Sequence, residues 1–179
     1  MTTNGTMNFR SFLSESVISD IKKEQKIFLL VIGGTASGKN YVYEKNFRFD
    51  LVDVDKIAYN LADGDLDKTR SVLSRAIAIA NKELEKSFSE GKSVAQVSTG
   101  AGAKGTQNKI KKAQSFGFKT ALVLVSTDPK VAQERNQERA LAGAQGLVPD
   151  WKVQKTNTEA RETFNLLKAS VDYSAVINN

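Results

Sequence analysis

A run of residues early in the chain has the composition and spacing of a phosphate-binding loop. It comprises Gly33, Gly34, Thr35, Ala36, Ser37, Gly38, Lys39 and Asn40, which is the pattern G-x-x-x-x-G-K with Asn where Ser or Thr is usual. Glycines let the backbone curl so that successive N–H groups point at phosphate oxygens, and the following helix adds its positive N-terminal end. Lys39 would reach the β- and γ-phosphates. The pattern predicts a loop that binds a nucleoside triphosphate.

The last residue of this motif departs from the usual pattern in a way that bears on a metal ion. Ser or Thr in place of Asn40 would put a hydroxyl on Mg²⁺. Asn40 offers a side-chain carbonyl oxygen, which hard cations accept, but its longer side chain shifts the geometry that Mg²⁺ demands. Asp53 is a carboxylate that could supply a second ligand. We expect ATP as the nucleotide and Mg²⁺ as its companion ion, with a metal site weaker than usual.

The composition restricts the chemistry that is available to the chain. Its 179 residues include no Cys and no His, which excludes disulfides, thiolate chemistry and imidazole ligands. Carboxylates must therefore do any acid–base work and oxygen must hold any metal, which favours phosphoryl transfer over triad hydrolysis or zinc chemistry. The net charge of +6 suits a polyanionic ligand. The sequence has no apolar stretch near the roughly 20 residues of a membrane span and no secretory pattern, so we expect a cytoplasmic location.

A second chemical candidate lies in the strand predicted at residues 49–55, FDLVDVD, whose alternation puts Asp53 and Asp55 on one face. Asp55 falls at the carboxyl end of this strand, the edge at which open α/β sheets place their ligands. A carboxylate there can orient a substrate hydroxyl or accept its proton. Because KIAYNLA follows directly, Asp55 could equally be the N-cap of a helix. Both interpretations stay open, and one residue could fill both roles.

Two arginines, Arg135 and Arg139, share a face of the helix that follows the strand predicted at residues 119–125. The segment STDP caps this helix, with Pro at its first position. Beside two glutamates, such arginines are normally solvent-facing. The helix leads into the small-residue segment 142–146, however, and this context favours a lid around residues 135–150 whose arginines close over the phosphates.

The remaining pattern indicates how these candidates are positioned. Further strands are predicted at residues 27–32, 93–97 and 173–177. Helices are predicted at residues 39–45, 106–116 and 149–169, and a long helix is predicted from just after the turn at 62–66 to about residue 90. Five strands that alternate with helices indicate an α/β fold with a parallel sheet. Residues 26–179 are expected to form one domain. Residues 1–25 are predicted to form a polar tail and a short amphipathic helix, which either packs on the edge of the domain or docks a protein partner.

From about Ile27 to Asn178, the sequence resembles the small P-loop kinases related to zeta toxins and to the kinase half of polynucleotide kinases, especially their phage-encoded members. The resemblance rests on GGTASGKN, VDVDKI, KIKKAQSFGFKTALVLVSTDP, VAQERNQERAL and VDYSAVINN. The opening MNFRSFLSE is also similar to the start of many tailed-phage proteins. These likenesses suggest a phage protein that works in an infected bacterial host.

The resemblance implies a P-loop NTPase fold of the nucleotide-kinase type, a five-stranded parallel sheet sandwiched by helices with the P-loop strand in its middle. It also implies that Asp55 activates an acceptor hydroxyl, and that Arg135 and Arg139 are lid arginines that hold ATP and the moving phosphoryl group. Acceptors in this group range over nucleic-acid 5′ ends, amino-sugar nucleotides, small metabolites and proteins. The leading hypothesis is therefore an ATP-dependent kinase that phosphorylates a hydroxyl.

Two departures from the family pattern support a second hypothesis. Asn40 replaces the metal-binding hydroxyl, and Val97 stands where similar phage sequences commonly end the third strand in Asp, just before a Thr-Gly pair. Loss of an ion that neutralises the phosphates can remove several kcal/mol of transition-state stabilisation. The alternative is a nucleotide-binding pseudokinase, an interaction module that needs or reports bound nucleotide.

Overall fold

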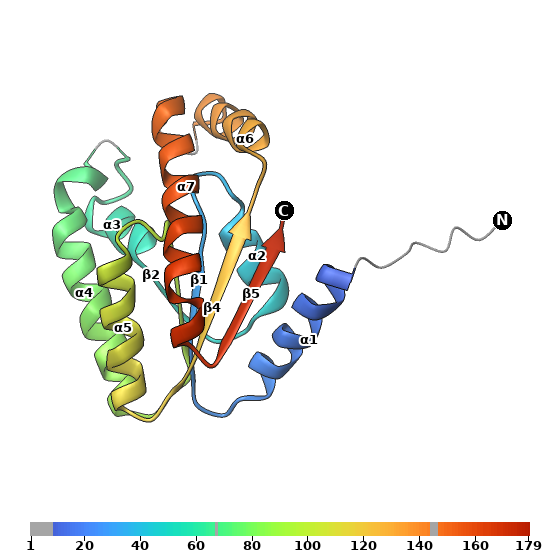
Figure 1. Cartoon of the computed structure of the whole chain (residues 1–179). Coiled ribbons are helices and arrows are strands. Elements are labelled where there is room, and N and C mark those ends of the chain that lie inside the picture. Colours follow the sequence, from blue (N-terminus) through green and yellow to red (C-terminus); the bar gives the residue numbers. More distant parts are fainter. Residues whose placement is uncertain (1–8, 67, 144–146) are drawn as a thin grey trace.

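The computed structural model describes residues 9–66, 68–143 and 147–179, and its centre is a five-stranded sheet (Figure 1). The strand order is β2-β3-β1-β4-β5, and each neighbouring pair runs parallel. This arrangement confirms the predicted α/β fold, with the P-loop strand in the middle of the sheet. The strands are β1 (Ile27–Ile32), β2 (Asp50–Asp53), β3 (Val94–Ser98), β4 (Lys119–Ser126) and β5 (Tyr173–Asn178).

Helices cover both faces of this sheet. In Figure 1, α4, α5 and α7 lie on one side, and α1 and α2 lie on the other. The short helix α3 packs against α4. The helices are α1 (Phe9–Lys23), α2 (Lys39–Asn46), α3 (Val54–Leu61), α4 (Thr69–Ser89), α5 (Ala103–Ser115), α6 (Pro129–Leu141) and α7 (Asp150–Leu167), and a 3₁₀ turn spans Lys168–Ser170.

Strand β1 explains why the two faces form separate cores. All six of its side chains are buried, as expected for a parallel strand covered on both sides. Phe28 and Leu30 pack with side chains of α4, α5 and α7, whereas Leu29 and Val31 pack with side chains of α1 and α2. The continuous apolar run IFLLVI therefore fixes β1 in the centre of the sheet, and the loop that follows it lies at the carboxyl edge.

The end of β2 differs from the prediction. The strand stops at Asp53, and α3 starts at Val54, so Asp55 lies in the first turn of that helix rather than on a strand face with Asp53. The cause is the Asp53 carboxylate, which accepts hydrogen bonds from the backbone N–H groups of Asp55 and Lys56 at 2.9 and 3.2 Å. The N-cap is thus Asp53, which rules out the alternative that Asp55 caps the helix, and the role of Asp55 toward an acceptor stays a prediction.

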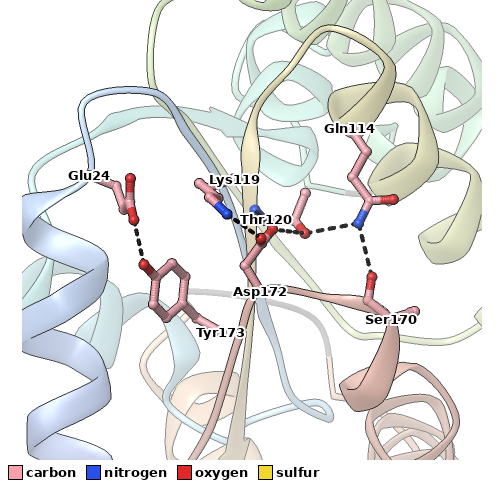
Figure 2. A network of polar contacts seen from close by, with 7 residues as sticks. All are labelled: Glu24, Gln114, Lys119, Thr120, Ser170, Asp172 and Tyr173. Atoms are coloured by element: carbon pink, nitrogen blue, oxygen red, sulfur yellow. Dashed lines mark hydrogen bonds and ion pairs between the residues drawn. The ribbon is translucent and has the colours of Figure 1, made fainter.

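The amino edge of the sheet is tied together by polar contacts (Figure 2). The carboxylate of Asp172 accepts hydrogen bonds from Lys119 Nζ at 2.9 Å and from the Thr120 backbone N–H at 2.8 Å. Nearby, the hydroxyl of Tyr173 donates to Glu24, and this hydrogen bond raises the pKa of Tyr173 to about 12. These contacts join β4, β5 and the segment after α1 at the edge opposite the P-loop.

Helix α1 supports the packing interpretation of the N-terminal segment. Ile18 and Ile21 are buried in the core that faces α2, and α1 lies against β5. A docking role for this helix stays a prediction. Within the described residues, none of the helices combines the length and the apolar character that a membrane span requires.

Candidate functional site

The P-loop connects β1 to α2, and its glycines are required by close contacts. A Cβ on Gly33 would lie 2.5 Å from Ser37 Oγ and 2.9 Å from the Val125 carbonyl oxygen. At Gly38, which precedes the first residue of α2, the backbone is left-handed with φ 81°. Glycine adopts this conformation without the steric cost that a side chain would add. The loop therefore closes into a tight curl at the N-terminus of α2, as phosphate binding requires.

Helix α7 holds the start of this curl. The Thr35 backbone N–H donates to Thr156 Oγ1 at 3.0 Å, and the Asn157 side-chain amide donates to the Thr35 carbonyl oxygen at 3.3 Å. Gly34 lies directly against Asn157, since a Cβ there would be 2.3 Å from the Asn157 Cγ. Sequence reasoning missed both α7 residues, because nothing local connects them to a loop more than a hundred positions earlier.

The ends of β4 and β5 hold the other side of the curl. The Ser37 carbonyl oxygen accepts hydrogen bonds from Thr127 Oγ1 at 2.8 Å and from Asn179 Nδ2 at 2.9 Å. Asn179 is itself placed by its backbone N–H, which donates to the Ser126 carbonyl oxygen at 2.9 Å. Neighbouring elements thus fix the shape of this side of the loop.

Lys39 is the first residue of α2, and its ammonium group lies within the curl. Its Nζ donates to the Gly34 carbonyl oxygen at 3.3 Å. Burial lowers the pKa of Lys39, and the charge of Arg139 lowers it further, while Asp55 and Asp53 act in the opposite direction. The structure therefore brings these predicted residues within electrostatic range of one another, although they come from three different helices and a strand end.

Asp55 is an exposed residue on the first turn of α3, and its charge acts on Lys39. Desolvation by the surrounding protein raises the pKa of the Asp55 carboxyl, and the neighbouring charge of Asp53 raises it further, whereas Lys39 lowers it. A carboxylate with a raised pKa is a stronger base than an ordinary Asp, so the arrangement suits the removal of a proton from a hydroxyl.

The two predicted lid arginines lie on α6. Arg135 points toward the P-loop, since a Cβ on Gly38 would be 3.4 Å from Arg135 Nη1. This buried nitrogen has no hydrogen-bond partner among the described residues. Arg139 is exposed, and its charge acts on Lys39. Arg135 therefore approaches the P-loop directly, whereas Arg139 is within electrostatic range of the P-loop amine.

The base of the α6–α7 connection is fixed by a buried asparagine. Asn136 Nδ2 donates to the Val148 carbonyl oxygen at 2.8 Å, and the Val148 N–H donates to Asn136 Oδ1 at 3.3 Å. Residues 144–146, in the centre of the predicted lid, lie outside the described residues. Within the described residues, α6 is therefore anchored to the segment that precedes α7.

A further arginine, Arg161 on α7, was not anticipated from the sequence. Its Nη2 donates to Ser126 Oγ at 3.3 Å and to the Thr127 carbonyl oxygen at 3.2 Å. Two residues along the helix, Thr163 Oγ1 donates to the Gly100 carbonyl oxygen at 2.7 Å. Helix α7 therefore contacts the P-loop, the end of β4 and the loop after β3.

The two predicted metal ligands lie on different elements, α2 and β2. Asn40 is exposed on the first turn of α2. Asp53 is half-buried at the end of β2, and one of its oxygens is engaged in capping α3. Among the described residues, no group of three or more Asp and Glu side chains could hold a metal ion.

Comparison with known protein families gives a match over most of the chain. A family model described as AAA domain matches residues 28–163. This range runs from β1 into α7 and includes the P-loop, Asp55, Arg135 and Arg139. No curated protein matches the chain at a significant level.

Solved structures share the fold. A structure of the PezAT toxin–antitoxin system of Streptococcus pneumoniae gives a TM-score of 0.72 at 14% identity, over 100% of this chain and 81% of that chain. A structure of the AvrRxo1-ORF1:-ORF2 complex with ATP gives a TM-score of 0.65 at 18% identity, over 93% of this chain and 58% of that chain. A structure of the Pnkp1/Rnl/Hen1 RNA repair complex gives a TM-score of 0.65 at 12% identity, over 83% of this chain and 48% of that chain. The predicted likeness to P-loop kinases is confirmed, whereas the phage origin stays a prediction.

Proposed function

The chain belongs to the AAA domain family, and from this premise we propose that it is an ATP-dependent kinase that transfers the γ-phosphoryl group to a hydroxyl. The acceptor would be a nucleotide, a nucleic-acid end, a sugar nucleotide or another hydroxyl compound. The observation that supports this most directly is that Lys39 and Asp55 lie within electrostatic range of each other, with Arg135 of α6 directed at the P-loop.

The proposed roles follow from the position of each group. The P-loop N–H groups and the Lys39 ammonium bind the β- and γ-phosphates, and the N-terminal end of α2 adds a favourable dipole. Arg135 meets the phosphates with a buried N–H that has no partner among the described residues. Arg139 stabilises the charge that develops on the phosphoryl group during transfer.

Asp55 acts on the acceptor. The acceptor oxygen forms a bond to the γ-phosphorus while the bond from that phosphorus to the β-phosphate oxygen breaks, which releases ADP. The proton of the acceptor hydroxyl passes to the Asp55 carboxylate. The raised pKa of Asp55 suits this step, because it makes the carboxylate a better proton acceptor.

Transfer of labelled phosphate from ATP to a panel of nucleotides, oligonucleotide 5′ ends, sugar nucleotides and proteins tests the proposal. Asp55→Asn should lower transfer by roughly 10²–10⁴-fold and leave ATP affinity nearly unchanged. Asp63→Asn, an exposed change just beyond the same helix, is the matched control. An Asp55→Asn protein that transfers phosphate at the wild-type rate would contradict the role given to Asp55.

A second candidate is a nucleotide-binding module that transfers no phosphate. It is favoured by Asn40 and Val97, which stand at the two places where P-loop kinases usually support a metal ion. A protein that binds ATP but labels no acceptor in the panel would support this candidate over the kinase.

A further inference from the structure

The positions that usually support magnesium in P-loop proteins lie on one side of the sheet, between the start of α2 and the end of β3. A hydroxyl after the P-loop lysine and a carboxylate at a strand end together hold the ion. Here the first position is Asn40, exposed on the first turn of α2. The second is Val97, which pairs in register with Val31 of β1, the strand that leads into the P-loop.

Val97 makes this part of the site apolar. Its side chain is only 6% exposed and packs with Val31 and Val42 in the core beneath α2. A hydrocarbon side chain therefore stands in the place of the carboxylate, and it offers no oxygen ligand to a cation.

Asp53 does not replace that carboxylate. It pairs in register with Val97, so it lies one strand farther from β1, a displacement of roughly 4.8 Å. Its Oδ1 accepts two backbone N–H groups at the start of α3, at 2.9 and 3.2 Å. This cap fixes the carboxylate toward α3. Mg²⁺ at nucleotide sites is usually held by one or two carboxylates beside the phosphates, and the capping bonds engage Oδ1 of Asp53.

Cationic side chains lie near the P-loop, in the part of the site that lacks the usual ligands for magnesium. The charge of Lys39 is influenced by Arg139 and, in the opposite direction, by Asp55 and Asp53. Arg135 directs a buried Nη1 without a described partner at the Gly38 turn. Guanidinium groups bind phosphate oxygens through paired N–H donors and keep their charge at any physiological pH. These groups can neutralise a triphosphate without a metal ion.

We propose that this site binds the free nucleoside triphosphate without a requirement for magnesium, with Arg135 supplying, beside the P-loop lysine, charge that the ion supplies elsewhere. This inference rests on the nucleotide binding of the proposed function and adds that the nucleotide binds without a magnesium ion. It holds for an active kinase and for a binding module alike.

Calorimetric titration of the full chain with ATP, in excess EDTA and in excess Mg²⁺ at matched ionic strength, tests this directly. The two dissociation constants should agree within about threefold, a small difference on the scale where 1.4 kcal/mol is tenfold. Tightening by Mg²⁺ of more than about tenfold would overturn the proposal and leave the nucleotide-binding function intact. Absence of ATP binding in both buffers would overturn both.

Variants test the role of Arg135 in ATP binding separately from the role of the metal ion. In EDTA, Arg135→Gln should weaken ATP binding by about tenfold or more, because a charge-assisted contact is lost, while the exposed Arg75→Gln should not. The pair Asn40→Thr and Val97→Asp should make ATP binding tighter in Mg²⁺ than in EDTA. Because Val97→Asp alters a buried position, Asn40→Thr alone and a thermal unfolding curve accompany it. An Arg135→Gln protein with wild-type affinity in EDTA would refute the arginine role.

Discussion

Replacement of Thr156 by Val tests whether α7 shapes the P-loop. The change keeps a β-branched side chain of similar size but removes the oxygen that accepts the Thr35 N–H at 3.0 Å. Thr156 is buried, with 8% of its surface exposed, so water replaces this acceptor poorly. An orphaned donor of this kind costs about 1–3 kcal/mol. For a domain of this size, a loss of about 2 kcal/mol lowers the melting temperature by roughly 4–8 °C.

The assay is thermal unfolding followed by circular dichroism, with and without ATP. Thr156→Val should melt at a lower temperature and gain less from ATP than the wild type, because its P-loop no longer has its starting shape. Thr156→Ser keeps the hydroxyl and should recover most of both effects. A Thr156→Val protein with the wild-type melting temperature and ATP response would show that the hydrogen bond to Thr35 does not hold the loop.

Three further changes probe other parts of the molecule. Lys39→Ala should weaken ATP binding by roughly 10–150-fold in calorimetry, because a hydrogen bond from a charged group contributes about 1.5–3 kcal/mol, and unchanged affinity would remove the P-loop from the binding site. Asn136→Ala should lower the free energy of unfolding in urea by about 2 kcal/mol, because two backbone groups of Val148 lose their partners, whereas the exposed Gln137→Ala should stay near the wild type. Asp172 gives a pH dependence: desolvation acts to raise its pKa, but the hydrogen bonds from Lys119 and Thr120 outweigh this and lower the pKa below its ordinary value of 3.8. The stability that Asp172 contributes is therefore full above that ordinary value and is lost as the pH falls through the lowered one. Acid unfolding of Asp172→Asn should lack this component, and an identical acid profile in the variant would contradict the assignment.

Local sequence signals predicted the fold and the P-loop because their physical causes are local. The run IFLLVI is typical of a strand that is buried on both faces. Asp128 followed by Pro129 marks the start of α6, where the Asp128 carboxylate accepts a hydrogen bond from the Lys130 N–H. The end of β2 was misplaced because VDVD fits the period of a strand. Only the capping bonds of Asp53, which a sequence pattern does not display, decide that the helix starts there.

The supports of the P-loop could not be predicted for a different reason. Thr156 and Asn157 on α7 look in sequence like polar residues of an ordinary amphipathic helix. Their contacts with Thr35 depend on how α7 lies across the carboxyl edge of the sheet, which is a result of tertiary packing. Asn179 is a still stronger case, because its side chain reaches a loop from the opposite end of the described chain.

The contacts of α7 give it a different role from α6, the helix that carries the two predicted lid arginines. Helix α7 is held through Thr156 and Asn157 at the P-loop, through Arg161 at the end of β4 and through Thr163 at the loop after β3. Any displacement of α7 would disturb all three loops at once. Helix α6 carries Arg135 and Arg139, and it is anchored to the following segment by Asn136 and packed on the P-loop and α7 by Ala132. We therefore expect α7 to keep the P-loop in shape when phosphates bind.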